Sequence, residues 1–148
     1  SHEFQVPIGD LVDFERDELV LVRDRLRWRS LLSSVTPIQI SFMAVTPRHP
    51  IMRTVLLRAI DNVEQQFYGK SSLEVTGPLL FGKVLHENLG AFQFKMQLED
   101  VGGALANIKT GKVAVVTKKG GSTQAHLRLN NTARYGDLWA RRTLYRQS

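Results

Sequence analysis

A basic and aromatic cluster in the first quarter of the chain has the residue types that bind anions. Arg25, Arg27 and Arg29 alternate with other residues, and Trp28 stands among them. A guanidinium group presents a rigid fork of N–H donors that matches the oxygens of a phosphate or a carboxylate. Arg27, Trp28 and Arg29 are therefore candidate contacts for a pyrophosphate, an acceptor or an anionic membrane. The structural alternative is a solvated loop with one anchored tryptophan.

The tripeptide Thr76-Gly77-Pro78 has the composition of a helix start. Proline is favoured in the first helical turn, and threonine or glycine before it can act as the cap. The N-terminus of a helix also presents unpaired N–H groups and the positive end of the helix dipole, which suit a phosphate or a sugar hydroxyl. The turn is thus either a simple helix start or a helix start that binds a ligand.

Composition excludes several kinds of site. The chain of 148 residues has no cysteine, so disulfides, thiolate zinc sites and cysteine nucleophiles are absent. It shows no Ser-His-Asp spacing, no nucleotide P-loop and no Rossmann fingerprint. The net charge of +6 favours contact with phosphate, whether of a nucleic acid, an anionic lipid or a nucleotide-linked substrate. The absence of RNP-type strands, zinc fingers and GxxG clamps argues against nucleic acid.

The elements that would position these residues follow from hydrophobic spacing. Strands are predicted at 19–23, 38–45, 91–98 and 111–119, with a further short piece at 126–129. The longest helix is predicted from Pro50 to Phe67, with His49 as its cap and Gly69 as its left-handed stop. Its predicted apolar face comprises Ile51, Val55, Leu56, Ile60, Val63 and Phe67.

Two more helices complete the predicted order. One begins at Pro78 and ends near Gly90, and a short one lies within 135–145, where Trp139 and Tyr145 are expected to pack it against the core. For Trp139, stacking on a sugar is the alternative role. The strand from Ala91 to Leu98 is expected to alternate between one buried and one polar face.

The resulting order predicts an α/β or α+β fold, with a sheet of about four strands, two consecutive helices and a short C-terminal helix. Residues 5–148 are expected to form a single domain. Residues 1–4 are typical of the remnant of an expression tag and are left out of this prediction. No apolar run approaches the length of about 20 residues needed to span a bilayer.

The order of short motifs resembles one family of enzymes. His49-Pro50, an amphipathic helix, Tyr68-Gly69 and Thr76-Gly77-Pro78 follow one another, and RYGDLWARRTLY stands near the C-terminus. This order resembles the DXD-containing glycosyltransferases of family 32, the type of the yeast initiating mannosyltransferase and of bacterial capsular polysaccharide transferases. The resemblance covers about residues 10–145 and is most specific from Phe42 to Leu85.

The resemblance implies a GT-A-like fold and transfer of a sugar from a nucleotide-sugar donor to a saccharide or glycoconjugate acceptor. It also implies a divalent cation, Mn or Mg, which stabilises the charge that develops on the leaving nucleoside diphosphate. Transferases of this fold often supply a late histidine to the metal or the pyrophosphate, which makes His126 a candidate ligand. The bacterial relatives favour a cytoplasmic location over the Golgi lumen.

This chain departs from the family pattern at one place. It contains no Asp-x-Asp pair, and the nucleotide-binding half of the fold that should precede the pair is missing too. We therefore expect the C-terminal part of a transferase, or a naturally shortened relative, that is inactive alone and does not bind the cation. Two alternatives from other classes are a basic, non-catalytic binding module and a scaffold that forms homo-oligomers through an exposed apolar surface.

Overall fold

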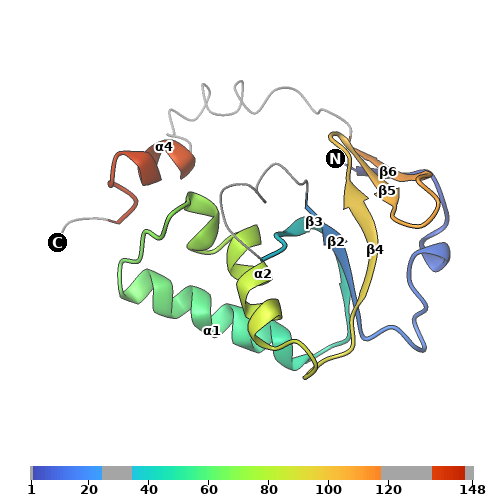
Figure 1. Ribbon diagram of the computed structural model, residues 1–148, viewed down its shortest axis with the longest axis horizontal. Coiled ribbons are helices and arrows are strands. Elements are labelled where there is room, and N and C mark those ends of the chain that lie inside the picture. The colour runs from blue at the N-terminus through green and yellow to red at the C-terminus, as the bar shows by residue number, and fades with distance from the viewer. Residues whose placement is uncertain (1, 25–34, 118–134, 146–148) are drawn as a thin grey trace.

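The computed structural model describes residues 2–24, 35–117 and 135–145, and these form a six-stranded mixed sheet with helices packed on one face (Figure 1). The predicted α/β class is confirmed. The strands are β1 (His2–Phe4), β2 (Leu19–Arg23), β3 (Ile38–Val45), β4 (Lys95–Asp100), β5 (Ala104–Asn107) and β6 (Val113–Thr117). The helices are α1 (Pro50–Glu64), α2 (Pro78–Glu87) and α4 (Tyr135–Ala140), with single 3-10 turns η1 (Ile8–Asp10) and η3 (Ser72–Glu74).

The strands lie in the order β1-β6-β5-β4-β2-β3. β2 runs parallel to β4, and every other neighbouring pair is antiparallel. β2 is therefore an interior strand with side chains buried on both faces, which is why its sequence reads as a continuous apolar run.

The sheet separates two hydrophobic clusters. Leu19 and Leu21 of β2 point to the side covered by α1 and α2, where they join Ile51 and Phe81. Val20 and Val22 point to the opposite side, and Leu11, which follows η1, packs with them there. The alternation of β2 thus ties both cores to one strand.

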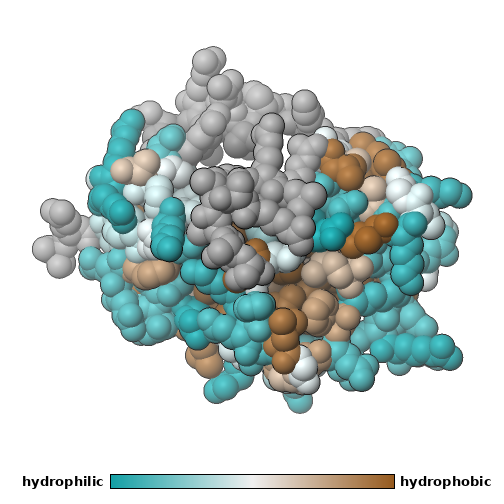
Figure 2. Space-filling view, viewed as in Figure 1, coloured by the Kyte–Doolittle hydropathy of each residue, from teal (hydrophilic) through white to brown (hydrophobic). Residues whose placement is uncertain are grey.

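Figure 2 shows one face of the molecule. Most of it is hydrophilic, and apolar residues come to the surface in small groups over the lower end of α2 and over the side of the sheet that carries β5 and β6. None of the helices among the described residues is both long and apolar enough to cross a membrane.

The strand expected at 91–98 forms later than predicted, at Lys95–Asp100, and its buried face changes side. Phe92, Phe94 and Met96 contact the helix-side cluster, whereas Leu98 belongs to the opposite cluster. The cause is a register shift in the β2–β4 pairing: Leu21 pairs with Met96, and Val22 pairs with Leu98. The extra residue resets the alternation, so the expectation of a single apolar face was wrong.

Helix α1 begins where expected but ends earlier. His49 is the cap, and its Nδ1 accepts a hydrogen bond of 3.2 Å from the backbone N–H of Ile51. The helix stops at Glu64, because Gln66 adopts a left-handed backbone with φ of 51°. Gly69 also has a positive φ, but it lies beyond the end of the helix and has another purpose, described below.

The number of strands and the role of the N-terminal residues differ from the prediction. Among the described residues the sheet has six strands instead of about four, because β1 and β5 are too short to show a hydrophobic period of their own. β1 pairs with β6, so residues excluded as a tag remnant take part in the sheet. The strand expected at 111–119 is confirmed as β6, although it is shorter. The piece expected at 126–129 lies outside the described residues.

Candidate functional site

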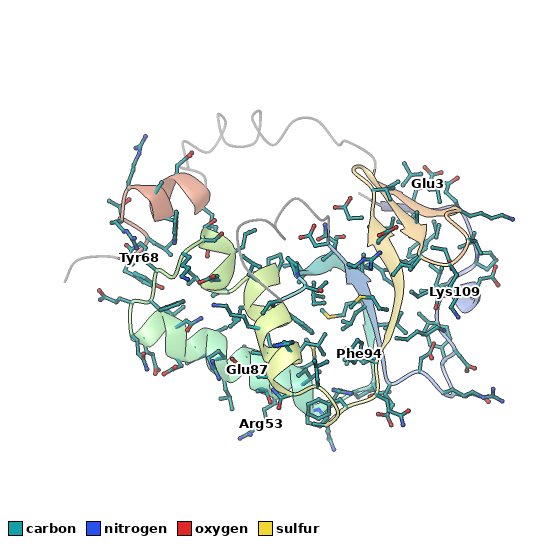
Figure 3. The ribbon with its side chains drawn as sticks, in the orientation of Figure 1. Glu3, Arg53, Tyr68, Glu87, Phe94 and Lys109 are labelled. Carbon is teal, nitrogen blue, oxygen red and sulfur yellow. The ribbon has the colours of Figure 1, made fainter. Side chains whose placement is uncertain are left out.

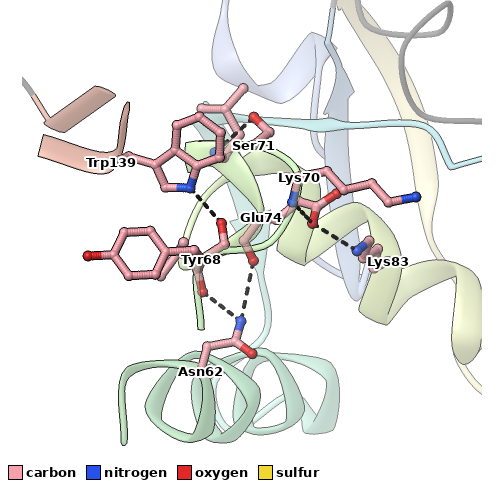
Figure 4. A network of polar contacts seen from close by, with 9 residues as sticks. Asn62, Tyr68, Lys70, Ser71, Glu74, Lys83 and Trp139 are labelled. Atoms are coloured by element: carbon pink, nitrogen blue, oxygen red, sulfur yellow. Dashed lines mark hydrogen bonds and ion pairs between the residues drawn. The ribbon is translucent and has the colours of Figure 1, made fainter. Parts of the chain in front are cut away.

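The loop that joins α1 to α2, residues 65–77, carries two of the family-like motifs. Tyr68-Gly69 stands at its start, and Thr76-Gly77-Pro78 leads from it into α2. A network of polar contacts holds this α1–α2 loop together, and Figure 4 shows it from close by.

A buried glutamate lies at the centre of the network. The side chain of Glu74 is 2% exposed, and its Oε2 lies 3.0 Å from the backbone N of Lys70, which donates a hydrogen bond, and 3.3 Å from Nζ of Lys83 on α2. Its second oxygen, Oε1, is buried and has no hydrogen-bond partner among the described residues. The Lys83 ammonium, which is 40% exposed, brings the compensating charge to the carboxylate from the adjacent helix.

Gly69 has no side chain because Glu74 occupies that space. A Cβ at Gly69 would lie 2.5 Å from Oε2 of Glu74, and φ at this position is +59°. Only glycine satisfies both conditions without strain. The Tyr-Gly pair is thus explained by the buried carboxylate on which it lies.

Asn62 fixes the end of the loop to α1. Its side-chain Nδ2 donates to the carbonyl oxygens of Glu74, at 3.3 Å, and Val75, at 2.8 Å. Asn62 is itself buried, in the last turn of α1. The buried amide provides hydrogen bonds to two carbonyl oxygens that would otherwise be buried without a partner.

The C-terminal helix α4 docks on the same loop. Trp139 donates from Nε1 to the carbonyl oxygen of Tyr68, and Tyr135 donates from its hydroxyl to the carbonyl oxygen of Ser72, both at 2.5 Å. The hydroxyl of Tyr145 lies 2.7 Å from the carbonyl oxygen of Phe67. Burial raises the pKa of Tyr145, and the neighbouring Tyr135 and Tyr68 add to the effect.

Trp139 is already engaged on two sides. Besides its hydrogen bond, its ring lies 5.5 Å from the guanidinium carbon of Arg142, which stands 4.5 Å from the ring centroid of Tyr68. Such cation–π contacts hold an arginine against aromatic faces. Trp139 therefore packs against other residues of the protein, through its contacts with Tyr68 and Arg142. A sugar could stack only on the part of its ring that these contacts leave open.

The Thr76-Gly77-Pro78 turn starts α2 as predicted, with Gly77 as the cap and Pro78 as the first helical residue. No side chain caps this helix, and Thr76 is exposed. The backbone angles of Gly77 (φ −106°, ψ −159°) are ones that any residue adopts. Glycine is needed here for space instead, since a Cβ would lie 3.1 Å from the carbonyl oxygen of Leu73.

The start of α2 offers backbone N–H groups that no side chain caps. Such groups can donate hydrogen bonds to a sugar hydroxyl or to a phosphate oxygen. The charge of Glu74 is compensated by the ammonium of Lys83 at 3.3 Å, so it does not decide between the two kinds of ligand.

The structure brings some of the predicted site residues together and leaves others undescribed. Thr76, Gly77, Pro78 and Trp139 all lie on or against the α1–α2 loop. Arg27, Trp28, Arg29 and His126 lie outside the described residues. In the described ranges no group of three or more His, Asp or Glu side chains could hold a metal ion.

Sequence reasoning missed Glu74 and Asn62. Both are polar residues with apolar residues nearby in the sequence, and polar residues on a solvated surface have the same kind of neighbours, so this pattern does not indicate that they are buried. The one signal that could have identified Glu74 is its place between two glycines, Gly69 and Gly77, which both make room for the loop backbone and its carboxylate.

A separate apolar cavity of about 140 Å³ lies between α2 and the sheet. Its walls include Gly82, Leu85 and Phe94, and His86 stands on its lining. Gly82 lets α2 approach the chain before β3, because a Cβ there would lie 2.4 Å from the carbonyl oxygen of Thr36. The cavity has few polar groups to orient a ligand.

Comparison with protein-family models, with curated proteins and with solved structures found no match to this chain.

Proposed function

We propose that this chain takes part in the transfer of a sugar from a nucleotide-sugar donor to a saccharide or glycoconjugate acceptor, and that the start of α2 forms part of the acceptor side. The observation that supports the proposal is a convergence. Helix α4, which carries the C-terminal part of the resemblance, docks on the loop that contains Tyr68-Gly69 and leads through Thr76-Gly77-Pro78 into α2.

The chemistry of that loop is consistent with an acceptor. An acceptor hydroxyl is neutral and both donates and accepts hydrogen bonds, and the turn offers backbone donors and the exposed Thr76 hydroxyl. The proposal assigns the Mn or Mg ion and the donor pyrophosphate elsewhere, because the chain has no Asp-x-Asp pair and the described residues provide no metal-binding group. No step that uses the ion is assigned to this chain.

Binding of simple sugars to the chain tests the acceptor assignment. The methyl glycosides of mannose, glucose, galactose and N-acetylglucosamine would each be titrated to high millimolar concentration while backbone amide resonances are recorded by NMR. At least one glycoside is expected to shift the amide resonances of Thr76, Gly77, Leu79 and Leu80, and the indole N–H of Trp139; Pro78 has no amide proton. Lys109, on the far side of the sheet, provides a resonance that should not move.

Two results would contradict the proposal. One is the absence of any shift at residues 76–80 with all four sugars. The other is a stronger response of the same amides to a nucleoside diphosphate, which would make the turn a phosphate site. Thr76→Ala serves as the matched variant, since Thr76 is exposed, provides no cap and its loss should weaken binding without changing the fold.

A separate prediction concerns turnover. Incubated with nucleotide-sugars and Mn²⁺ or Mg²⁺, the chain alone is expected to release no nucleoside diphosphate, because it lacks the acidic pair that would hold the cation. Metal-dependent release above that of a heat-denatured sample would show that the donor site lies within these 148 residues.

A further inference from the structure

The side of α1 that faces away from α2 is apolar and exposed. Leu56 is 61% exposed, Leu57 48%, Ile60 44% and Val63 47%. Leu56, Ile60 and Val63 were expected on the apolar face of this helix, but the helix packs on the sheet through Ile51 and through a partly buried flank. An unbroken apolar stripe of this kind on a helix marks an interaction surface.

Two opposite charges stand at the ends of the stripe. Arg53, Leu57, Ile60 and Glu64 are spaced four, three and four residues apart, so they lie along one side of the helix. We call this row, with Leu56 and Val63 beside it, the outer face of α1. Neither Arg53 nor Glu64 has an ion-pair partner among the described residues, and Figure 3 shows Arg53 directed away from the rest of the fold.

The order of the row is self-complementary. If a second α1 is laid against it in the antiparallel direction, Arg53 faces the other Glu64, and Leu57 faces the other Ile60. The two-fold axis then passes between Leu57 and Ile60, and each contact occurs twice, as in an isologous interface. Leucine and isoleucine meet at the centre, with an ion pair at each end.

We propose that the outer face of α1 binds the same face of a second copy of this chain, with the two helices antiparallel. A parallel pair would place Arg53 against Arg53 and Glu64 against Glu64, so the charges also exclude the alternative direction. The apolar centre provides the attraction, and the two ion pairs set direction and register. Spacing of three and four residues is the pattern of helices that pack about 20° from antiparallel.

Sedimentation velocity over a wide concentration range tests the proposal. The chain should pass from monomer to dimer as the concentration rises, and Leu57→Glu should abolish the dimer. Arg53→Glu and Glu64→Arg should each weaken dimerisation by roughly tenfold, because each places like charges together at both ends of the interface. All the substituted side chains are exposed, so the circular dichroism spectrum should be unchanged, and so should thermal unfolding at a concentration where the unaltered chain is monomeric.

The decisive variant combines the two charge reversals. Arg53→Glu with Glu64→Arg restores both ion pairs with their signs exchanged, and dimerisation should return close to that of the unaltered chain. Lys109→Glu is the control of equal charge change, because Lys109 is exposed on the β5–β6 turn, far from α1 in Figure 3. It should leave the dimer unchanged.

Three outcomes would overturn the inference. The chain could remain monomeric at all concentrations, which would show that the outer face of α1 does not bind a second copy of this chain. It could dimerise with no loss in Leu57→Glu, which would place the interface elsewhere. It could dimerise through this face but show no recovery in the double reversal, which would disprove the antiparallel register.

Discussion

At several positions of this fold a nearby carbonyl or carboxylate oxygen leaves room only for glycine. Gly69, Gly77 and Gly82 each leave out a Cβ that would lie within 3.1 Å of another atom, and those atoms are Oε2 of Glu74 and the carbonyl oxygens of Leu73 and Thr36. Of the three, Gly69 alone also has a left-handed backbone. It therefore combines a conformational and a steric requirement, which can be separated experimentally.

Gly69→Ala is expected to destabilise the fold by roughly 3 kcal/mol, of which about 1 kcal/mol is the cost of a left-handed backbone for alanine. The remainder comes from displacing Glu74 from Lys70 and Lys83. Gly90→Ala is the matched control, since Gly90 has a φ of +89° but nothing within 4 Å of its added Cβ. Urea unfolding measures the loss of unfolding free energy in both variants. Equal losses would show that Glu74 can move aside without destabilising the fold.

At the scale of elements, sequence periodicity was reliable wherever a segment has one buried face of its own. β2 and β3 have the predicted bounds, and α1 and α2 begin at the predicted prolines. Periodicity failed where contacts with another element determine which side chains are buried. The register shift before Leu98 is set by pairing with β2, and the outer face of α1 is apolar but not part of the core. Spacing alone cannot distinguish an apolar face that packs inward from one that binds a partner.

The candidate site divides in the same way. The helix start at Thr76-Gly77-Pro78 could be predicted, because proline and glycine act through local geometry. The burial of Glu74 and Asn62 could not, because it depends on a contact between α1, the α1–α2 loop and α2 that no local pattern encodes. Likewise, the hydrogen bond from Trp139 to Tyr68 joins residues far apart in the chain.

Helix α4 is expected to depend on that hydrogen bond. It has six residues, too few for a helix to be stable in water without docking. Trp139→Phe keeps an aromatic ring, although a smaller one, and removes the donor to Tyr68, at a cost of about 1 kcal/mol, so α4 should detach more often while the sheet stays folded. Amide hydrogen exchange should show faster exchange in α4 alone.

Arg141→Ala provides the comparison for α4, because Arg141 is exposed on the same segment and its only described hydrogen bond is made by its backbone. It should leave exchange in α4 nearly unchanged. If Trp139→Phe also left exchange unchanged, the docking of α4 would rest on Tyr135 and Tyr145 instead.

At the scale of the whole molecule, an ion pair joins the N-terminal segment to the sheet. Nζ of Lys95, on β4, lies 2.9 Å from Oδ2 of Asp17, whose side chain is 15% exposed. The hydrogen bond from Lys95 lowers the pKa of Asp17, and a second hydrogen bond, from the backbone N–H of Asp13, adds to the effect. Because the lowered pKa belongs to the folded state, the stabilisation is complete above the unfolded value of about 3.9 and is lost as the pH falls through the folded value.

Asp17→Asn should therefore lower the free energy of unfolding at neutral pH, and the difference from the unaltered chain should shrink as the pH falls through the lowered pKa of Asp17. Urea unfolding at several pH values measures this convergence. Glu15→Gln, an exposed change in the same segment, should give a difference that hardly varies with pH. If the difference in unfolding free energy between Asp17→Asn and the unaltered chain stayed constant with pH, the charge of Asp17 would not be the source of the stabilisation.

The parallel pairing of β2 with β4 also determines how the chain can fold. β4, β5 and β6 are consecutive and joined by short turns, so they can pair while the rest of the chain is still open. Val20, by contrast, pairs with Lys95 only after β3, α1 and α2 have been brought into place between them. Closing that long connection costs chain entropy before any contact is gained. We therefore expect the insertion of β2, the strand on which both cores depend, to be the slow step of folding.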